Sequence, residues 1–198
     1  MIYHIISDDI FFLLGASAAL KAVIKEGFII SNNINVNSWK HTRDEILKTP
    51  LQKIIIYIHC FRKRRRVLRL AASHDLSVII LTPLKLNEND TNNNSMLISP
   101  QCSTLDFLFS SLNSTSNYSY KNGWKKSYKI IKMLSSGVST HELSTKLGIS
   151  KKMVYTIKND TIRKLGLTTA KIDGLLLCRD ILEMNLINLR CNNIRKSR

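Results

Sequence analysis

The chain has 198 residues, 44% of them hydrophobic, and carries a formal net charge of +16. The apolar content is that of a globular protein, so a mainly disordered chain is excluded. The cationic excess favours a polyanionic partner, which by charge alone is either nucleic acid or an anionic membrane surface.

β-prone and helical runs alternate in the amino-terminal part of the chain. We predict strands at Met1–Ile6, Lys53–Ile58 and Ser77–Leu81, and helices at Phe11–Glu26, closed by Gly27, and at Val67–Ala72. This alternation predicts an α/β fold with a doubly wound parallel sheet that is covered on both faces. Ligands of such sheets lie at the carboxyl ends of the strands. The polar residues expected to gather at that edge are Asp8, Asp9, His59 and Thr82.

The apolar run at residues 10–24 could be mistaken for a targeting segment. Asp8 and Asp9 stand where a signal peptide has its positive region, and Lys21 interrupts the run too early for a membrane span. We therefore predict a cytoplasmic protein with no membrane partner. The cysteines, which lack paired spacing and are expected to be reduced structural thiols, are Cys60, Cys102, Cys178 and Cys191. His59 and Cys60 have no second ligand pair, so no metal site and no cofactor are predicted.

Five consecutive cations, Arg62–Arg66, precede the predicted helix at Val67–Ala72. Such a run invites a nucleic-acid interpretation. Five successive residues of a helix cannot share one face, however, so a solvated helix start is the favoured alternative. Further along, Asn113–Asn122 is polar and has no period, which indicates an interdomain linker.

A helix-turn-helix pattern follows in the last third of the chain. Ser139 and Glu142 have the spacing of a capping box, which begins a short helix. Gly148 suits a sharp turn, and Ser150 is placed to cap a second helix. A turn of three to four residues containing glycine is the signature of this motif.

The second helix of the motif is amphipathic. Its apolar positions step by three or four residues along Val154, Ile157, Thr161 and Leu165. The other face carries one acid, Asp160, among the cations and hydrogen-bonding residues Lys151, Lys152, Tyr155, Lys158, Asn159 and Arg163. A helix of this kind suits the DNA major groove, although a lysine-rich face is also compatible with simple solvation.

The amino-terminal part resembles a response-regulator receiver domain. The resemblance rests on Ile5–Asp9 followed by Phe11–Gly15, and on Ile79–Pro83 as the fourth strand. In that family two acids hold magnesium and an aspartate after the third strand accepts a phosphoryl group. Here the acceptor position falls at Ile58 or His59, and Ile98–Pro100 replaces the expected lysine. The resemblance therefore implies a degenerate receiver with no phosphoacceptor, in which Asp8 and Asp9 are either a remnant of the acidic pair or a solvated strand end.

The carboxy-terminal part is similar to the LuxR/FixJ-type DNA-binding domain. Three blocks keep register with it: Tyr128–Ser139, Leu147–Ser150 and Arg163–Leu167. The resemblance implies an all-α domain of four helices, with the third in the major groove and the fourth forming a dimer. By position, the base-facing residues would be Tyr155, Thr156 and Asn159. The phosphate-facing residues would be Lys151, Lys152, Lys158, Arg163 and Lys164. Met153 replaces a usual threonine, Ile157 a usual histidine and Tyr155 a frequent lysine, so the family's usual operator is not implied.

These observations predict a degenerate receiver-like domain over residues 1–112, a linker over 113–123, a LuxR-type domain over 124–185 and a basic tail over 186–198. The predicted function is a non-enzymatic transcription regulator that binds double-stranded DNA. The resemblance to small enterobacterial regulators further implies control of fimbrial genes, with repression, a related LuxR/FixJ-type partner and a homodimer as expectations. The alternative is an antagonist that pairs with a related regulator and does not bind DNA. The last helix, Thr169–Met184, offers Leu175, Leu176, Cys178 and Ile181 either to the domain core or to such a pairing.

Overall fold

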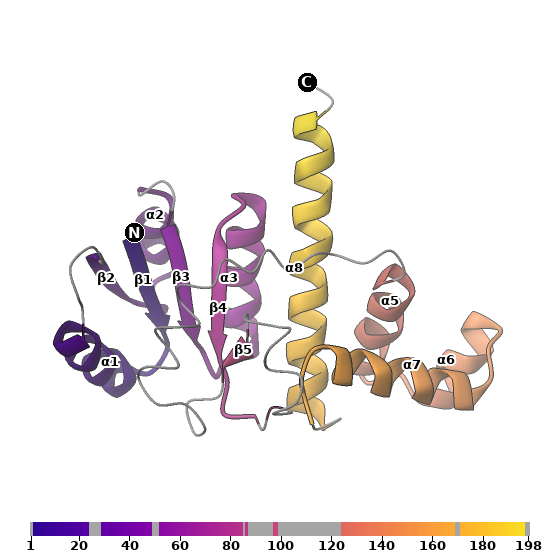
Figure 1. Cartoon of the computed structure of the whole chain (residues 1–198). Helices are drawn as coiled ribbons and strands as arrows, with labels where there is room; N and C mark the ends of the chain where they lie inside the picture. The colour runs from indigo at the N-terminus through magenta and orange to yellow at the C-terminus, as the bar shows by residue number, and fades with distance from the viewer. Residues whose placement is uncertain are drawn as a thin grey trace. The chain divides into compact units, whose positions relative to one another are not determined.

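The computed structural model describes residues 2–23, 29–48, 52–84, 86, 97–98, 124–168 and 171–196. The chain forms two compact units, Met1–Thr82 and Pro83–Arg198 (Figure 1). The predicted linker at 113–123, Gly27, Cys102, Ser99 and Pro100 lie outside the described residues. The domain boundaries proposed from sequence therefore stay predictions.

The first unit is built on parallel strands. In chain order its elements are β1 (Ile2–Ser7), α1 (Ile10–Val23), β2 (Ile29–Asn35), α2 (Trp39–Lys48), β3 (Gln52–Tyr57), α3 (Phe61–Ser73) and β4 (Ser77–Leu81). Strand order is β2-β1-β3-β4, and every pairing is parallel. α1 packs against β1 and β2, α2 against β2, and α3 against β4 (Figure 1). The parallel α/β fold predicted from the alternation of runs is confirmed.

The central strands are buried on both faces, as their sequence predicts. Ile5 and Ile6 point to opposite sides of β1, and neither is exposed to solvent. The same holds for Ile54 and Ile55 of β3, of which only Ile55 retains slight exposure. Burial of apolar side chains on both faces is typical of a parallel sheet between two layers.

β2 and α2 were not predicted. β2 contains Asn32, Asn33 and Asn35, which have low strand propensity, and it lies at the edge of the sheet with a register shift opposite Tyr3 and His4. α2 buries only Thr42 and Ile46. β2 is held by its pairing with β1, and α2 by its packing on β2, more than by their own sequence patterns.

The second unit contains β5 (Leu97–Ile98) and four helices, α5 (Trp124–Ser135), α6 (Thr140–Leu147), α7 (Lys151–Lys164) and α8 (Ile172–Lys196). The four predicted helices of the DNA-binding domain are thus present. α8 extends beyond the predicted end at Met184, because Asn185–Lys196 contains neither Gly nor Pro to stop it. The stretch assigned from sequence to a basic tail is therefore helical as far as Lys196. No helix among the described residues is apolar and long enough to cross a membrane.

α8 supplies part of the core of this unit. It contacts α5 and α7, and Cys178 and Ile181 are fully or almost fully buried, whereas Leu175 and Leu176 are half-buried. The sequence left two roles open for Leu175, Leu176, Cys178 and Ile181: the domain core or pairing with another molecule. Burial in the domain core accounts for Cys178 and Ile181. Burial raises the pKa of the Cys178 thiol to about 12, with a smaller contribution from Asp180, so this thiol stays protonated near neutral pH.

Candidate nucleic-acid interface

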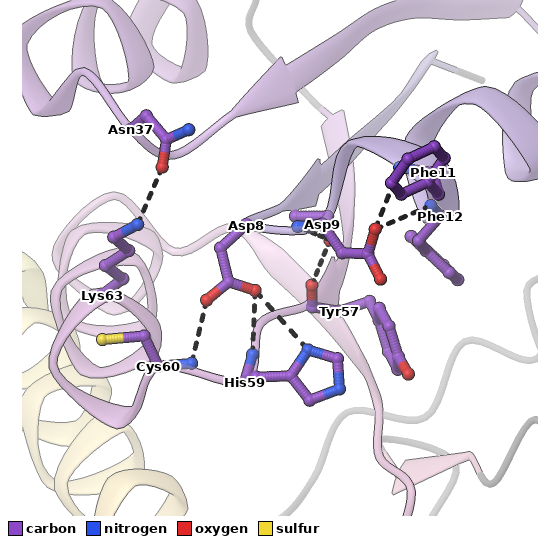
Figure 2. A network of polar contacts seen from close by, with 10 residues as sticks. Asp8, Asp9, Phe11, Phe12, Asn37, Tyr57, His59, Cys60 and Lys63 are labelled. Carbon is purple, nitrogen blue, oxygen red and sulfur yellow. Dashed lines mark hydrogen bonds and ion pairs between the residues drawn. The ribbon is translucent and has the colours of Figure 1, made fainter.

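The strand ends of the first unit carry the acidic pair that the sequence singled out. Asp9 is an N-terminal cap: its Oδ1 accepts hydrogen bonds from the backbone N–H of Phe11 at 2.9 Å and of Phe12 at 3.1 Å, at the start of α1 (Figure 2). The Ser7 hydroxyl donates to the Tyr57 carbonyl and accepts from the Asp9 N–H. Asp9 is therefore engaged in beginning a helix.

Asp8 joins β1 to the start of α3. Its two carboxylate oxygens accept from the backbone N–H of His59 at 3.0 Å and of Cys60 at 2.9 Å (Figure 2). The His59 ring Nδ1 lies 3.7 Å from the same carboxylate. Partial burial acts to raise the pKa of Asp8, but the N–H groups of Cys60, His59 and Asp8 itself, together with the His59 ring, outweigh burial and hold the pKa below its usual value.

The predicted gathering at this edge is found for three residues. Asp8, Asp9 and His59 lie together, and Thr82 is buried directly after β4. β3 is followed by buried Ile58 and exposed His59, so no carboxylate stands at its end. Among the described residues, no group of three or more acid, histidine or cysteine side chains is arranged to hold a metal ion. Asp9 acts here as the cap of α1, and Asp8 holds the backbone between β3 and α3 through the N–H groups of His59 and Cys60.

The helix-turn-helix forms as its local signals predict. Ser139 Oγ accepts from the Glu142 N–H at 3.1 Å, and Ser150 Oγ accepts from the Met153 N–H at 3.1 Å. Gly148, at φ 62°, ends α6 in the left-handed conformation that glycine adopts without strain. A hydrogen bond from Lys146 at 2.8 Å and the N–H of Ser139 both lower the pKa of Glu142, as the reciprocal half of a capping box would.

A small apolar core fixes the two helices of the motif. Ile130 of α5, Leu143 of α6 and Val154 of α7 are all buried and pack as one cluster. Met133, Leu134, Val138, Leu147, Ile149 and Ile157 surround this cluster. Thr161 of α7 and Leu165, which directly follows the helix, are also buried, and Ile157 is partly buried, so the apolar side predicted from sequence is confirmed.

The opposite side of α7 faces solvent. At about 100° per residue, Lys152, Thr156, Asn159 and Arg163 fall within an arc of about 60°, roughly opposite Val154, Thr161 and Leu165. We call these four residues, which are all exposed, the outer face of α7. Of the other predicted contact residues, Lys151, Tyr155 and Lys164 are exposed on its flanks, and Lys158 is half-buried.

Contacts within the helix hold several of these side chains. The Lys158 Nζ lies 5.1 Å from the centre of the Tyr155 ring, so the two side chains form one flank. The Thr156 hydroxyl donates to the Lys152 carbonyl at 3.0 Å and keeps only its accepting capacity for a partner. Arg163 Nη2 lies 3.3 Å from Asp160 Oδ1, an exposed pair that water and salt weaken.

Met153 was noted in the sequence only as a departure from the family pattern. It is 43% exposed and lies about 60° around α7 from Thr156. An exposed apolar side chain beside hydrogen-bonding residues is suited to the methyl group of thymine. The signal in the sequence that indicates Met153 as a contact residue is its position on the helix, two residues before Tyr155 and three before Thr156.

Comparisons with known proteins identify solved structures that are similar over most of the chain. No protein-family model and no curated protein sequence matches it. A solved complex of the two-component response regulator RcsB with DNA is similar, at a TM-score of 0.50 and 15% identity, over 90% of this chain and 98% of that chain. A structure of two RcsB dimers bound to two parallel DNAs gives a TM-score of 0.49 at 15% identity, with the same coverage. RcsB from Salmonella enterica serovar Typhimurium bound to the promoter rprA gives 0.41 at 17% identity, over 89% and 98%. At these identities, the first of these likenesses shows that the chain shares the fold of the response regulator RcsB.

Proposed function

We propose that this protein is a non-enzymatic transcription regulator that binds double-stranded DNA through α7. The observation that carries the proposal is the division of α7 into a buried side, packed on α5 and α6, and an exposed outer face of cations and hydrogen-bonding groups. Thr156 and Asn159 would contact base edges, with Tyr155 beside them. Lys151, Lys152, Lys158, Arg163 and Lys164 would contact phosphates. The fold shared with the RcsB–DNA complex supports this assignment.

The first unit, in this proposal, acts without phosphorylation. Asp8 and Asp9 satisfy backbone N–H groups, and β3 ends without a carboxylate. A receiver-like unit of this kind keeps its surfaces but not its phosphoryl chemistry. Docking to a related LuxR/FixJ-type regulator, or to a second copy of the chain, is the role we propose for it.

By length and layout the chain also resembles the enterobacterial fimbrial regulator FimW. On that resemblance we propose that the genes controlled are fimbrial and that the effect is repression. Reporter fusions to fimbrial promoters, in cells with and without each related regulator, would test both points. Equal repression in cells lacking every related regulator would contradict the proposed partner and leave direct repression through DNA.

The test of DNA binding is the salt dependence of affinity for a short duplex, measured by fluorescence anisotropy with the full-length protein. Each phosphate neutralised by a cation contributes about 0.9 to the slope of log affinity against log salt. Lys152→Gln with Arg163→Gln should therefore lower the slope by about 1.8. The matched control, Lys40→Gln with Lys48→Gln, removes the same charge from exposed positions of α2 and should leave the slope closer to wild type. If the two double variants have the same salt slope, α7 is not the DNA surface. The alternative of an antagonist that does not bind DNA is then favoured.

A further inference from the structure

α3 carries a second concentration of cations, and the structure divides it into two sets. The helix contains six cations and no acid: Arg62, Lys63, Arg64, Arg65, Arg66 and Arg69. Val67, Leu68, Ala71 and Ala72 form its buried side. Arg64 lies on that side in the first turn and Arg65 at its edge, and both are half-buried. The consecutive run therefore does not act as one unit.

Arg62, Arg66 and Arg69 form the exposed set. At about 100° per residue they fall within an arc of about 60°, opposite the buried side of α3. All three are exposed, and we call them the arginine stripe. The stripe spans about 10 Å along the helix axis, at about 1.5 Å per residue.

Neighbouring side chains orient part of this surface. The Arg66 guanidinium lies 5.9 Å from the centre of the Trp39 ring of α2, and the Arg62 guanidinium lies 5.8 Å from the Phe61 ring. Lys63 Nζ, on the edge of the stripe, is bonded to Asn37 Oδ1 at 2.8 Å (Figure 2). Guanidinium groups resting on aromatic faces keep their N–H forks available to an anion such as phosphate.

The stability of α3 does not explain these cations. Arg62, Lys63 and Arg64 lie in the first turn, where the partial positive charge of the helix end repels them, and the last turn carries no basic residue. Arg62 and Arg66, four residues apart, also repel each other, as do Arg66 and Arg69. The Asp8 carboxylate, bonded to the N–H groups of His59 and Cys60, supplies one compensating charge at this end. A helix that places cations against its own dipole is suited to an external polyanion.

We propose that the arginine stripe is a second contact surface for DNA, which binds the sugar–phosphate backbone without reading bases. The stripe's length of about 10 Å matches three base-pair steps of about 3.4 Å, measured along the axis of a duplex. Arginine forks bind pairs of oxygens on phosphate as they do on carboxylate, and the net charge of +16 together with the DNA surface proposed on α7 favours the phosphate backbone as the partner. This proposal rests on the DNA-binding function proposed above, but it involves residues of the other unit.

The experiment compares two triple variants of the full-length protein in the same anisotropy assay. Arg62→Gln, Arg66→Gln and Arg69→Gln together should lower the salt slope by about 2.7. Replacement of the same three arginines by Lys keeps the charge and should keep most of the slope. The melting temperature of both variants is measured alongside, because the glutamine variant removes repulsion within α3 but also the contacts of Arg66 with Trp39 and of Arg62 with Phe61. A loss of slope with unchanged or raised melting temperature would therefore not come from unfolding.

The outcomes separate this proposal from the function of α7. A wild-type slope in the glutamine variant overturns the stripe as a DNA surface and leaves an acidic protein or plain solvation as its role. A reduced slope in both the glutamine and the lysine variants, with lower melting temperatures, also overturns it, because α3 has then simply been damaged. A reduced slope in the glutamine variant alone supports the stripe. If the α7 double variant keeps its slope at the same time, the proposed function of α7 fails while the stripe stands.

Discussion

The two units of this protein differ in whether the polar side chains singled out by the sequence are engaged within the fold. At the strand ends of the first unit, Asp9 caps α1 and Asp8 accepts hydrogen bonds from the backbone N–H groups of His59 and Cys60, just before α3. In the second unit, Ser139 and Ser150 cap α6 and α7, and the outer face of α7 is left toward solvent. The sequence suggests a metal-binding pair for Asp8 and Asp9, but both carboxylates are bonded to backbone N–H groups of the fold. The comparison shows that a polar side chain can bind a ligand only if its donors and acceptors are not already engaged within the fold.

The largest expected effect comes from removing the core that separates the two sides of α7. Leu143 is completely buried between α5, α6 and α7. Leu143→Ala should cost about 2–5 kcal/mol of unfolding free energy and abolish DNA binding. Denaturant unfolding with hydrogen exchange on both units would measure it, and protection of β1 and β3 should survive. Met153→Ala is the control: it truncates an exposed apolar side chain and should change stability by no more than about 0.5 kcal/mol.

The outer face of α7 should divide into two classes of residue. Asn159→Ala should reduce discrimination between the operator and random duplex by about 1–3 kcal/mol, because a side-chain amide can bond two atoms of one base. Lys152→Gln should weaken both complexes alike. Competition binding on an operator selected from random duplexes would measure the difference. Identical behaviour of the two variants would contradict the separation of base and phosphate contacts.

Asp8 should contribute to stability and not to DNA binding. Asp8→Ala should cost about 0.5–1.5 kcal/mol, because the N–H groups of His59 and Cys60 lose their acceptor. Because the pKa of Asp8 is lowered in the folded protein, this contribution is present above pH 3.8 and is lost as the pH falls through the lowered pKa. Unfolding curves of wild type and variant should therefore converge in acid. Asp44→Asn, which changes an exposed acid of α2, should give no such pH-dependent difference.

The smallest expected effect is that of phosphodonors on the first unit. Acetyl phosphate with magnesium should leave no hydroxylamine-sensitive label, because the backbone N–H groups already occupy the carboxylates of Asp8 and Asp9, and His59 stands where an aspartate would be needed. Intact-mass measurement checks this directly. A stoichiometric acyl phosphate would show that the strand-end carboxylates are available after all, and would remove the contrast between the units.

The parts of the fold that sequence predicted are those governed by local signals. Ser139, Gly148 and Ser150 determine caps and a turn within a few residues, so the helix-turn-helix followed directly from their spacing. β2 was missed because its formation depends on β1, which is distant in the sequence, and α2 because it packs on β2. The role of Asp8 was missed for the same reason, since its partners His59 and Cys60 lie 51 and 52 residues away.

The arginine stripe was missed for a different reason. The sequence interpretation considered Arg62–Arg66 as a consecutive run, whereas the helical period joins Arg62 and Arg66 to Arg69. The burial of Arg64 and Arg65 could not be anticipated without knowing which side of α3 packs on the sheet. The net charge indicated a polyanionic partner. Distinguishing the exposed cations of α3 from the half-buried ones required knowledge of the fold.

The caps and core of the helix-turn-helix use side chains that are entirely separate from the outer face of α7. Ser139, Gly148 and Ser150 position the helix, and Val154 anchors it, without any help from Asn159 or Arg163. Substitutions on the outer face are therefore nearly free of folding cost, as exposed helix positions generally are. This makes the helix a transplantable specificity element: grafting the outer face of another regulator onto this scaffold should redirect it to a new DNA site, and such exchanges are open to evolution in single steps.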